Sequence, residues 1–124
     1  MTSWPDFAAL PSIELKAVGE LAPVEVLYEF DGPCIFTALT EQQNLVLAYL
    51  SEDLEDEKLL RFVVATTSEA TVAALKDGSV SVREALERGS IWLVDSDHSY
   101  RPQKAAACRL ADLPEDALPA STTM

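Results

Sequence analysis

The only histidine of the chain, His98, closely follows two aspartates, Asp95 and Asp97. An imidazole beside carboxylates could hold a metal ion or act as an oriented general base. Either role needs further ligands or a nucleophile, and the neighbouring sequence supplies neither. We therefore expect residues 95–99 to form a solvated turn. A small-ligand sensor or an enzyme that uses Asp95, Asp97 and His98 is kept as an alternative.

A second group of polar residues lies in the acidic segment 51–58. Its carboxylates have the chemistry of a calcium site, but Leu54 interrupts them and the Asp-x-Asp-x-Asp-Gly spacing that would arrange them is absent. We expect a solvated loop, with a docking surface for a basic partner as the functional alternative. The candidate partner-binding residues of this segment are Glu52, Asp53, Glu55, Asp56 and Glu57.

Other catalytic patterns are missing from the sequence. The four glycines form no phosphate-binding loop, and no Gly-x-Ser-x-Gly elbow is present. Cys34 and Cys108 lie in apolar, strand-like segments, where a free thiol behaves as a small buried hydrophobe. We therefore predict no catalytic residue, no metal site and no cofactor.

The charge balance restricts the class of partner. The chain has 124 residues, 21 of them acidic and 9 basic, for a formal net charge of −12. Such a charge repels nucleic acids and anionic membranes, whereas it attracts a basic partner or keeps the protein in solution. No apolar stretch approaches the ~20 residues that span a bilayer, and the N-terminus lacks the pattern of a secretory signal. We expect a cytoplasmic protein.

The elements that must position these side chains begin with a β-hairpin. Residues 24–30 alternate in polarity, Asp31-Gly32 suits a two-residue loop, and a second apolar run follows over 33–39. This loop would pair Tyr28 with Ile35 and Val26 with Thr37. The face expected to join the core consists of Val24, Val26, Tyr28, Phe30, Pro33, Ile35 and Leu39.

The opposite face of this hairpin is mixed, with Leu27 and Phe36 near each other across the strands. Either another element covers these two side chains or they form an exposed apolar patch. Leu27 and Phe36 are therefore added to the candidate partner-binding residues.

Further strands are predicted over 45–50, 59–66, 91–94 and about 104–110. Between the fourth and fifth strands the hydrophobic period changes to that of two short helices. The first is capped by Thr67 or Ser68 and ends at Gly78, and the second begins at Ser81 with a capping box. We predict an α+β fold: an antiparallel β-meander of about five to six strands, with two short helices inserted before the fifth. Residues 1–22 are a lead-in, 23–119 a single domain and 120–124 a flexible tail.

The hairpin sequence Tyr-Glu-Phe-Asp-Gly-Pro over 28–33 resembles an uncharacterised bacterial family of small stand-alone domains. The segment 82–86, the aromatic strand at Trp92 and the two Leu-Pro pairs near the C-terminus add to the resemblance. These motifs concern turns and packing, so the resemblance implies a fold and carries over no activity or catalytic residue.

The leading hypothesis is a non-enzymatic module that binds another protein, as a regulator, an inhibitor or an immunity-type protein does. It depends on the negative charge, the missing catalytic patterns and the apolar side chains of the hairpin. The alternative from another class is a self-associating structural or accessory subunit, in which the mixed hairpin face is the interface of a homodimer.

Overall fold

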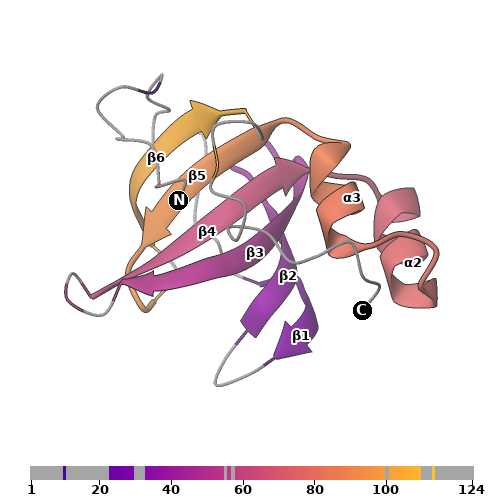
Figure 1. The fold of residues 1–124 in the computed structure, drawn as a ribbon, viewed down its shortest axis with the longest axis horizontal. Coiled ribbons are helices and arrows are strands. Elements are labelled where there is room, and N and C mark those ends of the chain that lie inside the picture. The colour runs from indigo at the N-terminus through magenta and orange to yellow at the C-terminus, as the bar shows by residue number, and fades with distance from the viewer. Residues whose placement is uncertain are drawn as a thin grey trace.

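A computed structural model describes residues 10, 23–29, 33–54, 56, 58–99, 101–109 and 113. These residues form one six-stranded sheet in the order β1-β2-β3-β4-β5-β6, in which every neighbouring pair is antiparallel, together with two helices (Figure 1). The elements are β1 (Glu25–Glu29), β2 (Pro33–Leu39), β3 (Leu45–Leu54), β4 (Leu59–Thr66), α2 (Glu69–Asp77), α3 (Val82–Glu87), β5 (Ile91–Ser96) and β6 (Pro102–Cys108). The meander, and the two helices between β4 and β5, agree with the prediction from sequence. The predicted lead-in, apart from Leu10, and the predicted tail lie outside the described residues.

The strands differ from their predicted bounds mainly in length. β4 has the predicted range, but β3 continues past Leu50 to Leu54, and β5 continues past Val94 to Ser96. Both extensions are mainly polar, and both pair with β4. The extension of β3 pairs from Glu52↔Arg61 to Leu54↔Leu59, and the extension of β5 includes the pair Arg61↔Asp95. A polar side chain does not end a strand whose backbone has a partner on the neighbouring strand.

The two helices begin where their capping residues predict. Ser68 is the N-cap of α2, its hydroxyl oxygen accepting the Thr71 N–H at 3.2 Å, and Gly78 ends the helix in the left-handed region with φ 83°. Ser81 caps α3: its oxygen accepts the Glu84 N–H and its hydroxyl donates to Glu84 Oε1, both at 3.1 Å. Both helices are short, so packing must stabilise them.

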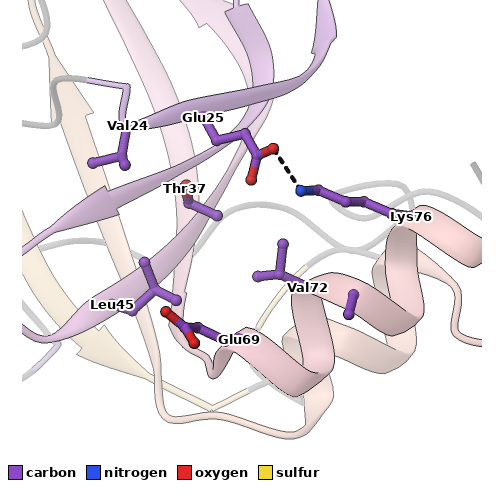
Figure 2. Close-up of a pocket in the computed structure, with 8 residues that line it drawn as sticks. Val24, Glu25, Thr37, Leu45, Glu69, Val72 and Lys76 are labelled. Carbon is purple, nitrogen blue, oxygen red and sulfur yellow. Dashed lines mark ion pairs between the residues drawn. The ribbon is translucent and has the colours of Figure 1, made fainter.

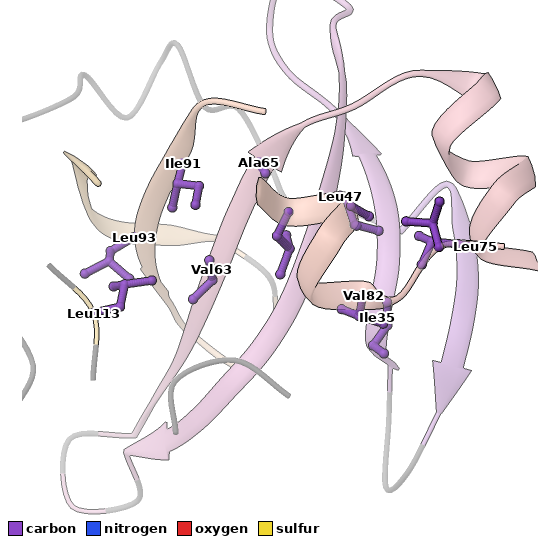
Figure 3. Close-up of a cluster of buried hydrophobic side chains, with 12 residues drawn as sticks. Ile35, Leu47, Val63, Ala65, Leu75, Val82, Ile91, Leu93 and Leu113 are labelled. Atoms are coloured by element: carbon purple, nitrogen blue, oxygen red, sulfur yellow. The ribbon is translucent and has the colours of Figure 1, made fainter. Parts of the chain in front are cut away.

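One face of the sheet packs against these helices. Figure 3 shows α3 lying across the central strands, with Val82 near Ile35 and Leu75 of α2 beside Leu47. Burial of these apolar side chains holds the helices to the sheet. The cluster consists of Ile35, Leu47, Val63, Ala65, Leu75, Val80, Val82, Ala85, Leu86, Ile91, Leu93 and Leu113.

The other face of the sheet is buried as well. Its cluster contains an edge-to-face aromatic pair, Phe36 and Phe62, whose ring centroids are 5.5 Å apart. The full cluster is Phe36, Ala38, Val46, Ala48, Phe62, Val64, Val94 and Ala105. Because successive side chains of a strand point to opposite faces, the central strands are apolar at nearly every position.

This second cluster corrects the predicted orientation of the hairpin. Val26 is paired with Phe36 rather than Thr37, and Glu29 with Pro33, because two register shifts interrupt the ladder around Tyr28. Tyr28 remains paired with Ile35, as predicted. Val24, Val26 and Tyr28, expected in the core, are 60%, 43% and 53% exposed, since β1 lies at the edge of the sheet. Phe30 lies outside the described residues.

The structure thus predicts effects of very different size on the free energy of unfolding for two apolar truncations. Leu86→Ala, in the fully buried part of α3, should lower the free energy of unfolding by about 2–5 kcal/mol. Val26→Ala, on the exposed edge, should change it by less than about 0.5 kcal/mol. Urea denaturation followed by circular dichroism measures both. A larger cost for Val26→Ala would place β1 in the core after all.

Candidate functional site

The side chains of Asp95, Asp97 and His98 do not form a single site. Asp95 lies in β5 rather than in a turn, and its side chain is fully buried. Arg61, directly opposite on β4, binds it in bidentate fashion: Nε donates to Oδ1 at 2.7 Å and Nη2 donates to Oδ2 at 2.8 Å. A carboxylate held in this way by a guanidinium is a structural ion pair inside the sheet.

Asp97 and His98 lie in the turn that joins β5 to β6. Asp97 Oδ1 accepts the backbone N–H groups of Ser99 at 2.8 Å and Arg101 at 3.0 Å, while His98 is exposed. The bond from Arg101, followed by that from Ser99, holds the pKa of the Asp97 carboxyl below its usual value. Asp97 therefore stabilises its own turn. The exposure of His98 and Ser99 agrees with a solvated turn over this part of the predicted segment.

The acidic segment is divided by the end of β3. Glu52 and Asp53 are exposed residues of that strand, and Asp56 is exposed in the connection to β4. Glu55 and Glu57 lie outside the described residues. Among the residues with described positions, no three His, Cys, Asp or Glu side chains are grouped closely enough to share a metal ion.

Of the two alternatives for Leu27 and Phe36, cover by another element or an exposed apolar patch, the structure does not show the patch. Phe36 is fully buried in the second cluster, so it is not accessible to a partner. Leu27 is partly buried against the first cluster, near the opposite face of the sheet. The two side chains were predicted to lie together, but the register shift in β1 separates them. The exposed apolar residues of the hairpin are instead Val24, Val26, Tyr28 and Leu39.

Cys34 and Cys108 form no disulfide and are partly buried, whereas the sequence predicted buried reduced thiols. Cys34 lies close enough to Tyr49 for their charges to interact. Burial of Tyr49 is the main cause of a raised pKa of its phenol, the thiolate of Cys34 raises it further, and the guanidinium of Arg83 opposes both. This group adjoins the first core cluster, to which Tyr49 is packed.

A hollow of about 330 Å³ lies between α2 and the β1 side of the sheet. Figure 2 shows it between the helix face that carries Val72 and the strand segments that carry Val24 and Leu45. We call it the α2–β1 pocket. It is lined by Val24, Glu25, Thr37, Leu45, Glu69, Val72, Ala73 and Lys76.

Charged groups lie at the rim of the α2–β1 pocket. The Lys76 ammonium, from the last turn of α2, forms an ion pair with Glu25 of β1 across the pocket, and both side chains remain about half exposed (Figure 2). Glu69, in the first turn of α2, is a second carboxylate on this rim. The pocket therefore combines an apolar lining with two carboxylates and one ammonium group.

Sequence reasoning missed the α2–β1 pocket. Its residues come from β1, β2, β3 and α2, which are adjacent only in the folded sheet. One local signal was available: Glu69, Val72, Ala73 and Lys76 follow the i, i+3, i+4, i+7 spacing of a single helix face. That spacing does not reveal what the face lies against.

Comparison with protein-family models, with curated proteins and with solved structures found no match to this chain. The resemblance noted for residues 28–33 thus stays a prediction. No helix in the described part of the chain has the length and apolar character needed to cross a bilayer.

Removing one partner of the Arg61–Asp95 pair should destabilise the fold strongly. Asp95→Asn removes the carboxylate that Arg61 binds in bidentate fashion and should lower the free energy of unfolding by about 3–5 kcal/mol, whereas the double variant Arg61→Met/Asp95→Leu should recover most of that loss. Chemical denaturation of the three proteins measures this coupling. If the double variant is as unstable as Asp95→Asn, an unpaired charge is not the cause.

The Asp97 carboxyl should titrate at lower pH in the folded protein than in the unfolded chain. Its folded pKa is depressed, so its contribution to stability is complete above the unfolded pKa of about 3.9 and is lost as the pH falls through the folded value. Carbon-detected NMR of the side-chain carboxyl should give a midpoint below 3.8 in buffer and a higher one in urea. Equal midpoints would contradict the two hydrogen bonds.

Proposed function

We propose that this chain is a small acidic module that binds another protein in the cytoplasm, as a regulator, an inhibitor or an immunity-type protein, without catalytic chemistry of its own. The observation that carries the proposal is the exposure of Val26 and Tyr28 in the short edge strand β1, and of Val24 directly before it. Apolar side chains gathered on a surface favour a protein interface, since a partner removes them from water. The carboxylates of the adjoining α2–β1 pocket fit the polar rim of such an interface.

The charge of the chain favours a basic partner over a second copy. Two copies would bring together formal charges of −12 each, whereas a basic protein would be attracted over a long range. The two register shifts in β1 also make its outer edge irregular, and irregular edges pair poorly with another strand. A homodimer is thus the less favoured occupant of this surface.

The alternative of a sensor or enzyme built on the His98 segment has less support. Asp95 is neutralised by Arg61 inside the sheet, and Asp97 is bound to the backbone of its own turn. Both carboxylates therefore already have structural partners, a guanidinium for Asp95 and two backbone N–H groups for Asp97.

Affinity capture from a lysate of the source cells, with a matched pair of variants, tests the proposal. A basic protein should be retained by the wild-type chain where the Debye length is about 30 Å, near 0.01 M salt, and released where it is about 3 Å, near 1 M. The variant Val26→Ser/Tyr28→Ser should lose this protein, while the control Glu41→Gln, in the exposed turn before β3, should retain it.

Light scattering of the purified chain at micromolar concentration completes the test. A monomer that captures a basic protein through β1 supports the binding module. A stable dimer that is dissociated by Val26→Ser/Tyr28→Ser would instead support the self-associating subunit and overturn the proposal.

A further inference from the structure

We propose that the α2–β1 pocket receives one long cationic side chain, a lysine or an arginine, of the partner protein. This inference rests on the proposed function and assigns the chemistry of its central contact. A lysine or arginine side chain has an apolar stem and a charged end, and it buries the stem while keeping the charge near polar groups. The pocket has the matching arrangement, with Val24, Leu45 and Val72 as apolar walls and Glu25 and Glu69 at the rim.

The ion pair between Lys76 and Glu25 is an intramolecular precedent for such a contact. Lys76 extends from α2 across the pocket, and its ammonium group reaches the carboxylate on β1 (Figure 2). A cationic side chain therefore reaches Glu25 from the helix side without any change in the sheet. A partner's side chain would compete with Lys76 for the same carboxylate.

An incoming cation can displace Lys76 from Glu25 with little loss of free energy. Both side chains of the Lys76–Glu25 pair are about half exposed, and ion pairs of this kind contribute little to stability. Replacing Lys76 by an incoming cation therefore costs little, and the released ammonium group returns to solvent. Lys76 is in this sense a weak internal competitor of the partner.

Glu69 supplies the second carboxylate for the incoming side chain. It lies on the same helix face as Val72 and Lys76, one turn before Val72. Among the ion pairs formed by described residues, none involves Glu69. With Lys76 bound to Glu25, the rim carries one carboxylate in excess, which attracts a cation and repels an anion.

An NMR titration with a minimal probe tests the pocket directly. The probe is Nα-acetyl-arginine N-methylamide, and its neutral control is the citrulline analogue, which has nearly the same shape. The arginine probe should shift the amide resonances of 69–76 and 24–27 in a saturable manner. The citrulline analogue should bind more weakly by about twofold to fivefold, the range of an exposed charge pair.

Three single variants assign the roles of the charged residues. Glu69→Gln should weaken the probe by about twofold to fivefold, and Lys76→Gln should strengthen it by a similar factor because it frees Glu25. Glu41→Gln, which makes the same change of charge as Glu69→Gln away from the pocket, should leave the affinity unchanged. All three positions are exposed, so unaltered amide spectra will show that each variant is folded.

The inference is overturned if the arginine and citrulline probes bind equally, if the shifts lie away from the pocket, or if Lys76→Gln weakens the probe. If it fails while Val26→Ser/Tyr28→Ser still abolishes capture of a basic protein, the proposed function stands and the pocket is not its anchor. Conversely, an arginine-selective pocket in a chain that captures no protein would support the pocket and overturn the proposed function.

Discussion

The register between β4 and β5 depends on one ion pair. In a sheet with one apolar and one polar face, a slip of one residue exposes the apolar side chains, and this cost fixes the pairing. Here β3, β4 and β5 are apolar on both faces, so burial alone discriminates weakly between registers. The bidentate contact of Arg61 with the fully buried Asp95 supplies the missing discrimination, because any slip between β4 and β5 would leave a buried carboxylate without its counter-charge.

The strand β1 is free of that constraint, and its properties differ accordingly. It has a neighbour in the sheet on one side, its ladder is interrupted twice, and its side chains Val26 and Tyr28 are exposed, while Leu27 is partly buried. The same strand provides Glu25 to the α2–β1 pocket, and Val24, directly before the strand, also lines it. The part of the sheet that holds the buried ion pair and the part that we propose binds a partner thus lie at different places.

Local sequence patterns predicted the helices and strands, but not which face of the hairpin is buried. The range of β4, the caps at Ser68 and Ser81 and the left-handed exit at Gly78 each follow from neighbouring residues, and the structure confirms them. The burial of Phe36 was not predictable in this way, since it depends on Phe62 of β4 and on the bulged register of β1. A hairpin read by itself cannot show which face a distant strand will cover.

The same limit applies to the candidate sites. Asp95 was assigned to a polar loop because serine, aspartate and histidine follow it, whereas its actual partner is Arg61, 34 residues earlier in the chain. The α2–β1 pocket is likewise assembled from four separate elements. In both cases the decisive neighbour lies across the sheet, so spacing along the sequence carries no information about it.

The helical segment leaves and re-enters the sheet at a single place. The Thr66 N–H donates to the Ser90 carbonyl at 3.2 Å, the Ser90 N–H donates to the Thr66 hydroxyl at 3.0 Å, and a Cβ on Gly89 would stand 2.0 Å from the Thr66 carbonyl oxygen. Hydrogen bonds therefore hold the two ends of the segment 67–89 next to each other at the end of β4. Substitutions at the exposed positions Glu69, Ala73 and Lys76 of this segment would therefore alter the wall over β1 while the ladder beneath keeps its pairing.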